Sequence, residues 1–455
     1  MFLKFAQKFK PDIICLIILS LTIPIFFYKL GQSSLVSWDE AWYATIARNI
    51  AQTGDFLHMK WNGEPYLDHP PFGFWLTALI FKIFGTHEFW ARFSQAAAGL
   101  GVVYLVYFLG KKLFNRLVGL ISALALSSAF WFVYRARSGN LDILLTLFFL
   151  LSFYLALQAY KNQKFLPLCL SLIGLFLTKT IVPLAIIPSL IIILWSKMTN
   201  KRVWKYLGIA FLAFFSWWIY QVLKYPAFLN NFFSVGLRGV QIESNYLDNF
   251  LLAKTYLHNG IGRWFWPGVL GVSLALILRQ KRLLILAIFI ITFLIPVAFS
   301  HKVHIWHLIP LYPFLILGFF GGAWALFERF LPSQRYVLFG LIIVLSLYIY
   351  AIQIRQVWYQ IIDIPRYISD EAILSREAAK YPQILLTDGD FNPAATFYSG
   401  KNVHKISRYQ LANLFNGPES FLLITNDWRL QEANINPQSY QLIKKDRDKV
   451  LVLHQ

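Results

Sequence analysis

Long apolar runs alternate with short polar connections along most of the chain. A bilayer core needs about 20 apolar residues in helical form, so each run predicts a membrane-spanning helix. The runs lie near residues 12–30, 90–110, 117–134, 141–160, 165–178, 181–196, 206–223, 264–278, 283–300, 304–327 and 336–354. The pattern therefore predicts a polytopic α-helical membrane protein with about eleven transmembrane helices.

Basic residues lie in every second connection between these runs. The positive-inside rule assigns such connections to the cytoplasm, which places the N-terminus inside and the C-terminus outside a plasma (inner) membrane. The first run has no clear small-x-small cleavage site before Trp38, so we expect an uncleaved span. The basic connections hold Lys4/Lys8/Lys10, Lys111/Lys112/Arg116, Lys161/Lys164, Lys197/Lys201/Arg202/Lys205, Arg279/Lys281/Arg282 and Arg329/Arg335.

The opposite side carries the longer polar segments. Two of them are loops, at about 31–89 and 224–263, and we expect amphipathic helices in the first loop. The third is the tail, where the pattern changes to a helix, two short strands and a hairpin, at 364–381, 383–390, 419–427 and 440–455. Residues 1–355 are thus predicted to form a transmembrane domain, and 356–455 a small extracytoplasmic α/β domain.

Composition supports a membrane protein. Of 455 residues, 57% are hydrophobic and 14% charged, and the mean hydropathy is +0.53, whereas soluble domains carry about 25% charged residues. The net charge of +20 reflects the basic connections, so we expect membrane lipids and no nucleic acid as partners. Cys15 and Cys169 lie in apolar runs, which argues against disulfides and cysteine metal sites.

Ionisable residues at membrane depth are costly, and they mark functional sites. Here they come from at least five separate connections, yet nearly all share the outer side. This convergence predicts one site there. The residues are Asp39, Glu40, Asp68, His69, Arg135, Arg137, Asp142, Lys179, Arg238, Arg263, His301, Lys302, His304 and His307.

Several of these residues can instead be explained by structural roles. Ser37 and Glu40 match a capping box at the start of a helix that runs to Ile50, which leaves Asp39 without such a role. Asp68 and His69 can cap a helix after the two prolines, and the arginines of YRARSGNLD can snorkel to the interface. The three late histidines fall roughly on one helix face, but aromatic packing is commoner than a metal site there.

Acids beside lysines and arginines at a membrane face suit transfer of a group from a lipid phosphate. A carboxylate takes the proton of an attacking hydroxyl. Lysine and arginine stabilise the departing phosphate, and a divalent metal ion can do the same. Glycosyl transfer, with its oxocarbenium-like transition state, fits this set of groups.

The order of several segments resembles the C-type, multi-span glycosyltransferases, within them the group of protein mannosyltransferases and lipid A aminoarabinose transferases. The likeness covers about residues 10–320. It rests on WDEAWYA, YLDHPPFGFW, FGTHEFWAR, YRARSGNLD, FLTKT and HKVHIWHLIPLYP. The resemblance implies a polyprenyl-phosphate sugar as donor. Asp39 matches the family's catalytic base or acceptor-binding acid, Asp142 the acid that opens the fourth span, and Lys179 and Lys302 its donor-phosphate positions.

We therefore predict an inverting glycosyltransferase that moves a sugar to a lipid, protein or glycan at the outer face. Residues typical of aminoarabinose transferases are replaced here by Trp42 and Asp68-His69-Pro70-Pro71. The identity of the transferred sugar therefore stays open. The predicted groups are Asp39 (base), Glu40 and Asp142 for catalysis; Lys179, Arg137, Lys302, His69 and Arg238 for donor phosphate; Asp68 for acceptor or metal positioning; and, if a metal binds, Asp39, Asp68 or Asp142.

Three alternatives remain open. A transporter or flippase of lipid-linked sugars would carry its ionisable groups near the bilayer midplane, usually with internal repeats. A non-catalytic assembly protein of the cell envelope would bind a partner through the tail. An enzyme that transfers a lipid-linked oligosaccharide would need a larger outer groove.

Overall fold

The computed structural model describes residues 2–236, 246–300, 303–388 and 393–455. The chain divides into two compact units. The membrane unit comprises Met1–Lys29, Leu67–Gly73 and Gln95–Ile364, and the loop–tail unit comprises Leu30–Tyr66, Phe74–Ser94 and Pro365–Gln455.

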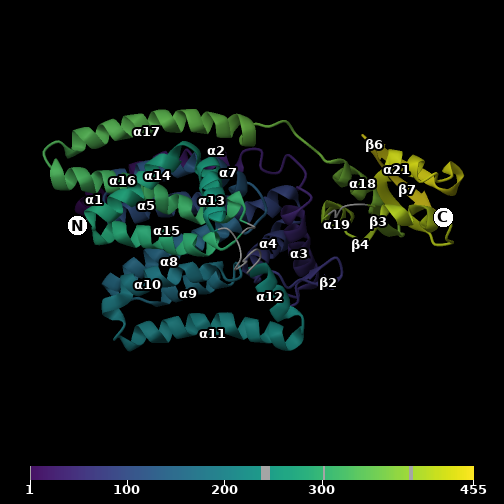
Figure 1. Cartoon of the computed structure of the whole chain (residues 1–455), viewed down its shortest axis with the longest axis horizontal. Helices are drawn as coiled ribbons and strands as arrows, with labels where there is room; N and C mark the ends of the chain where they lie inside the picture. The colour runs from purple at the N-terminus through teal and green to yellow at the C-terminus, as the bar shows by residue number, and fades with distance from the viewer. Residues whose placement is uncertain (1, 237–245, 301–302, 389–392) are drawn as a thin grey trace. The chain divides into compact units, whose positions relative to one another are not determined.

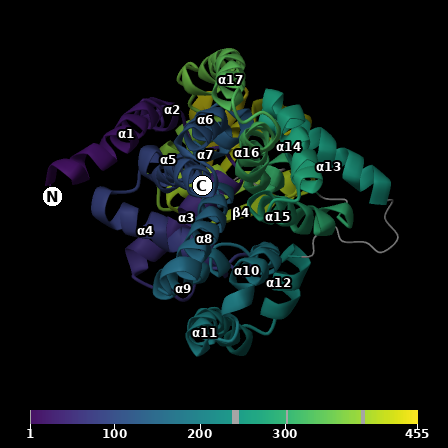
Figure 2. The same cartoon turned by 90° about the vertical axis from the view of Figure 1, so that its left-hand side faces the viewer.

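The membrane unit is a bundle of apolar helices around α16 (Tyr312–Phe330). The span that contains α16 is 94% buried, whereas α11 (Lys201–Lys224) and the span of α17 (Arg335–Val357) are only 17% buried. These two lie on opposite sides of the bundle (Figures 1 and 2). The other helices are α1 (Phe2–Ser20), α2 (Ile23–Phe27), α5 (Glu88–Leu113), α6 (Arg116–Ser127), α7 (Phe130–Ala136), α8 (Asp142–Asn162), α9 (Leu166–Phe176), α10 (Ile187–Leu194), α12 (Phe228–Gly236), α13 (Tyr246–Ile261), α14 (Phe265–Leu278) and α15 (Lys281–Ala298).

The polytopic helical fold is confirmed, but the predicted count of eleven spans is not. Within the described residues, seven helices are long and apolar enough to cross a membrane, or up to eight if the pair α6 and α7, bent by 71°, is one span. Shorter apolar helices cover Pro11–Phe27, Leu166–Phe176 and Val182–Lys197, where the pattern also predicts spans. The prediction of a loop at 224–263 was wrong for the residues of α13 (Tyr246–Ile261). This helix continues into α14 as a 33-residue candidate span.

One buried glutamine links the bend between α6 and α7 to the turn between α13 and α14. Gln353 of α17 is 2% exposed. Its Nε2 donates to the carbonyl oxygens of Ser128 and Ile261, at 2.9 and 3.1 Å, and its Oε1 accepts from the amide nitrogen of Arg263 at 3.0 Å. A broken helix frees backbone groups that lipid cannot satisfy, and this side chain pairs three of them.

Replacing Gln353 by leucine is expected to lower the free energy of unfolding by about 3 kcal/mol, because buried backbone groups lose their partners. Thermal unfolding in detergent measures the effect. Gln356→Leu is the matched control, since Gln356 is exposed on the same helix. Equal unfolding temperatures for the two variants would contradict the assignment.

The loop–tail unit is built on a five-stranded sheet. The strand order is β4 (Val403–Ile406), β3 (Ile384–Asp388), β5 (Phe421–Asn426), β7 (Lys449–His454) and β6 (Gln441–Asp446). The first three strands are parallel, and the β5–β7 and β7–β6 pairs are antiparallel. The predicted strands and hairpin are confirmed. The predicted helix at 364–381 shortens to α18 (Asp370–Ala378), where Ser369 is the N-cap.

Both faces of the central strand β5 are covered, which explains its continuous apolar sequence. Leu422 and Ile424 pack on one face, in a core with Leu374 of α18, whereas Phe421 and Leu423 pack in a core on the other face. The remaining elements of the unit are α3 (Asp39–Thr53), β1 (Lys60–Trp61), β2 (Glu64–Pro65), α4 (Phe72–Phe84), α19 (Pro393–Ser399), α20 (Leu411–Phe415) and α21 (Asp427–Glu432).

The first loop folds together with the tail. Arg48 of α3 donates to the carbonyl oxygens of Thr396 and Phe397, at 3.3 and 2.6 Å. The side chain of Asn62 both donates to and accepts from the backbone of Val403, at 2.8 and 2.6 Å. The compact unit thus includes the loop as well as the tail. The predicted domain boundary at 355/356 stays a prediction.

An ion cluster ties α18 to β7. Lys449 contacts Asp370 at 3.4 Å and also pairs with Glu371. Burial opposes the charged forms, but hydrogen bonds and the opposite charges outweigh it. The pKa of Asp370 is therefore lowered and that of Lys449 raised.

These opposite shifts give the stability of the loop–tail unit two pH limits. The Asp370 contribution is present above its unfolded pKa of about 3.9 and is lost as pH falls through the lower folded value. The Lys449 contribution is present below about pH 10.4 and is lost as pH rises through the higher folded value. Hydrogen exchange of β7 across pH is expected to show both limits. Lys449→Met should reduce both pH-dependent contributions to stability. Limits unchanged from those of the wild type would contradict the role of the ion cluster.

Candidate active site

Asp142 holds two cations in the membrane unit. This first residue of α8 is 2% exposed. Its Oδ1 accepts from Nζ of Lys179 at 2.6 Å, and its Oδ2 accepts from Nη2 and Nε of Arg135, at 2.7 and 3.1 Å. Lysine and arginine bind phosphate by charge-assisted hydrogen bonds, so the cluster is suited to receive an anion.

Local sequence places these three residues. The side chain of Asn140 accepts from the amide nitrogen of Asp142 at 3.1 Å, which starts α8. Arg135 lies in the last turn of α7, and Lys179 lies in the turn after α9. The sequence identified Asp142 and Lys179 as site residues. Arg135 was among the converging ionisable residues but received no catalytic or phosphate-binding role, because an arginine at a span end is most simply explained by snorkelling.

Aromatic rings cover the Arg135 side of the cluster. The Arg135 guanidinium carbon lies 4.9 Å from the ring centroid of Trp306, on which the ring of His304 stacks at 4.5 Å. His307 accepts from the amide nitrogen of His304 at 3.3 Å. No group of three or more His, Cys, Asp or Glu side chains with metal-holding geometry occurs in the described part of the chain. The predicted residues Lys302 and Arg238, and His301 with them, lie outside the described residues.

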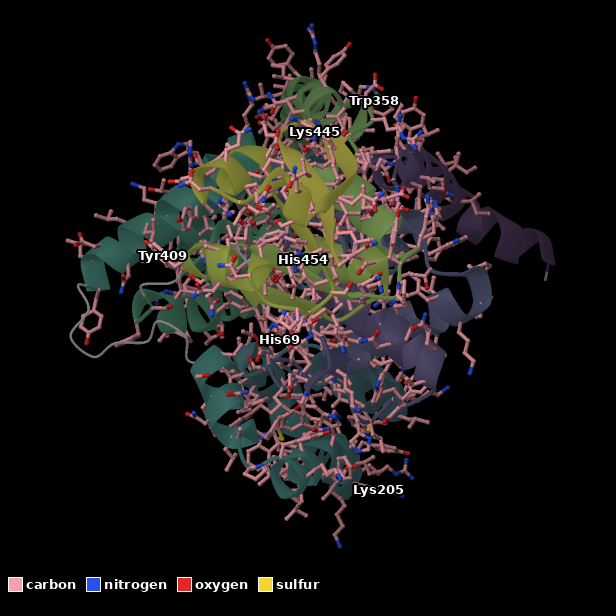
Figure 3. The ribbon with its side chains drawn as sticks, turned by 90° about the vertical axis from the view of Figure 1, so that its right-hand side faces the viewer. His69, Lys205, Trp358, Tyr409, Lys445 and His454 are labelled. Atoms are coloured by element: carbon pink, nitrogen blue, oxygen red, sulfur yellow. The ribbon has the colours of Figure 1, made fainter. Side chains whose placement is uncertain are left out.

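The DHPPFG segment is attached to the turns that carry Asp142 and Lys179. The amide nitrogen of Phe72 donates to the carbonyl oxygen of Leu177 at 3.0 Å. A Cβ on Gly73 would lie 2.3 Å from Cδ2 of Leu141, so a larger residue at this position would displace the Leu141 side chain. Asp68 and His69, both half-buried, precede these contacts by a few residues; Figure 3 labels His69.

Arg137 has a structural role. Its Nη1 and Nη2 donate to the carbonyl oxygens of Ile25 and Tyr28, at 3.0 and 2.8 Å, where α2 ends. A cation at the carbonyl end of a helix stabilises the helix. The predicted role of Arg137 in phosphate binding stays a prediction.

Asp39 and Glu40 begin α3 in the loop–tail unit. The predicted capping box was wrong: the N-cap is Trp38, without a side-chain cap, and the Ser37 hydroxyl accepts from the amide nitrogen of Ala394 at 3.2 Å. Glu40 is 4% exposed, and its Oε2 accepts from the amide nitrogen of Val36 at 2.7 Å. Asp39, half-buried, is the first residue of the helix.

Arg92, in the first turns of α5 that belong to the loop–tail unit, fixes this helix start. Its Nε and Nη2 donate to the two carboxylate oxygens of Glu40, at 2.7 and 2.9 Å. Its remaining bonds, at 2.9 Å, reach the carbonyl oxygens of Leu30, Ser33 and Ser34. Arg92 is 7% exposed, so the whole network is buried. The sequence shows this arginine in the second apolar run, but it does not predict that Glu40 is its partner.

Comparison with known proteins identifies the group that this arrangement resembles. Residues 68–220 match the model of the dolichyl-phosphate-mannose-protein mannosyltransferase family. An undecaprenyl phosphate-α-4-amino-4-deoxy-L-arabinose arabinosyl transferase of Shewanella sediminis is 28% identical over 155 residues, 32% of this chain and 28% of that protein. A protein of Aquifex aeolicus is 33% identical over 160 residues, 35% of this chain and 32% of that protein.

The fold comparison extends over nearly the whole chain. The crystal structure of ArnT from Cupriavidus metallidurans bound to undecaprenyl phosphate has a TM-score of 0.76 at 15% identity, covering 98% of each chain. The resemblance to C-type glycosyltransferases of this group is confirmed. The chain covers about a third of the length of the Aquifex aeolicus protein and 28% of the Shewanella sediminis transferase.

Proposed function

We propose that the protein is a membrane glycosyltransferase that moves a sugar from a polyprenyl phosphate to an acceptor. The observation that carries the proposal is the buried pair of cations on Asp142. It is supported by the fold shared with an ArnT that binds undecaprenyl phosphate. The proposed orientation places the N-terminus in the cytoplasm and the chemistry at the outer face of the inner membrane.

The donor phosphate is assigned to the membrane unit. As the bond from the anomeric carbon to phosphate breaks, its electron pair moves to the phosphate oxygen. Lys179 and Arg135 stabilise that developing charge by charge-assisted hydrogen bonds, and Asp142 holds both cations in position. His69, Arg137, Lys302 and Arg238 remain proposed contributors to the same role.

Acceptor activation is assigned to Asp39. Its carboxylate takes the proton of the acceptor hydroxyl as the hydroxyl oxygen bonds to the anomeric carbon, on the sugar face opposite the breaking bond. Such displacement inverts the configuration. Glu40 positions this helix start through Arg92, and Asp68 positions the acceptor. A divalent ion, if one is required, would be held by Asp39, Asp68 or Asp142.

Donor turnover tests the proposal. The full chain is reconstituted in liposomes with polyprenyl-phosphate mannose or aminoarabinose, and release of polyprenyl phosphate is followed with lipid, peptide and glycan acceptors. We expect release that depends on the protein, from one of the donors. Movement of intact donor between leaflets without release would instead favour a transporter. If neither release nor movement occurs, a non-catalytic assembly protein is favoured.

A further inference from the structure

A patch of lysines lies in the connections that the charge pattern assigns to the cytoplasm. The candidate site lies in connections that the same pattern assigns to the outer side. We infer that Lys197, Lys281 and Tyr160 form a binding site for the phosphate headgroup of an anionic membrane lipid. The site is separate from the proposed transfer chemistry, and it does not depend on that function.

Two ammonium groups converge on one ring. Nζ of Lys197 lies 5.4 Å from the ring centroid of Tyr160, and Nζ of Lys281 lies 5.7 Å from it. The three residues come from the last turn of α8, from the 3₁₀ turn Trp195–Lys197 and from the start of α15. An aromatic ring attracts both cations, but it cannot neutralise them. The pair therefore presents two positive charges to one ligand.

The part of the chain that the structure describes places no carboxylate in an ion pair with these lysines. The sequence contains no aspartate or glutamate between Asp142 and Glu243. The nearby Glu328 is already paired with Arg282. Further exposed bases lie in the same connections: Lys161, Lys164, Lys201, Arg202 and Lys205, the last of them labelled in Figure 3.

The surroundings place the site at a membrane surface. Trp195 and Trp204 are 73% and 60% exposed, and exposed tryptophans mark the headgroup level of a bilayer. Asn200 donates to Gln163 at 2.9 Å, which ties the two basic connections together. The positive-inside rule assigns this end to the cytoplasm, where anionic lipids attract basic clusters. A lipid phosphate, held at the surface beside these rings, is the occupant that fits.

Native mass spectrometry of the purified full chain tests the site, with phosphatidylglycerol and phosphatidylcholine of the same acyl chains as probes. Wild-type protein is expected to bind phosphatidylglycerol at least tenfold more tightly. Lys197→Gln/Lys281→Gln should lose most of this preference. Lys161→Gln/Lys164→Gln, which removes the same charge from the same patch, should keep it.

Three outcomes would overturn the inference. Equal losses in the two double variants would mean a diffuse surface charge. No preference in the wild type would mean no site. Displacement of the lipid by millimolar inorganic phosphate would mean a phosphate site without lipid specificity. Thermal unfolding of each variant separates a lost site from a misfolded protein.

Discussion

Replacing Lys179 by methionine is expected to lower kcat for sugar transfer by about 10²–10³-fold, the loss typical of one donor to a developing oxyanion. Lys179 supplies the ammonium group 2.6 Å from Asp142, and methionine keeps much of its length without its charge. The measurement is release of polyprenyl phosphate at saturating donor. Lys179→Arg keeps the charge, so we expect it to retain more activity than the methionine variant.

Two controls separate catalysis from folding. Lys224→Met removes an exposed lysine from the end of α11 and should leave kcat unchanged. Thermal unfolding of Lys179→Met reports how much the Asp142 pair contributes to stability. Wild-type kcat in a folded Lys179→Met protein would remove Lys179 from the donor site.

Breaking the Glu40–Arg92 pair is expected to have the largest effect on stability in the loop–tail unit. Removing one partner of a buried ion pair costs about 3–5 kcal/mol, because the other charge stays buried without compensation. Glu40→Gln leaves Arg92 in this state. Arg92→Met should be more damaging still, because three carbonyl groups of the first loop also lose their donor.

Hydrogen exchange of α3 measures this effect directly. Faster exchange is expected at the start of the helix, together with a lower kcat, because Asp39 lies there. Glu64→Gln, at an exposed position of β2, is the matched control. Exchange in Glu40→Gln as slow as in this control would contradict the positioning role of the pair.

Local patterns predicted the parts of the fold that depend on neighbouring residues. Apolar runs located the bundle helices, and short runs bounded by turn residues located β3, β5 and the β6–β7 hairpin, because each signal comes from the segment itself. The sequence failed where a distant partner decides the outcome. Glu40 matched a capping box, but an arginine 52 residues later takes its carboxylate.

The candidate site shows the same division. Asp142 and Lys179 were identified as charges at a membrane boundary, which is a local property. Their pairing joins residues 37 positions apart, and it required packing of the turns. Arg135 shares the same carboxylate, yet a snorkelling side chain explained it equally well. Hydrophobic patterns do not distinguish an arginine that points to water from one that turns back to a carboxylate.

We propose Asp39 as the base in sugar transfer from a polyprenyl phosphate. The most direct measurement is single-turnover transfer by Asp39→Asn with the active donor and acceptor, alongside binding of the donor. We expect unchanged donor binding and a chemical step slower by about 10²–10⁴-fold, with partial recovery at higher pH as the acceptor hydroxyl ionises. Full transfer by a folded Asp39→Asn protein would contradict it.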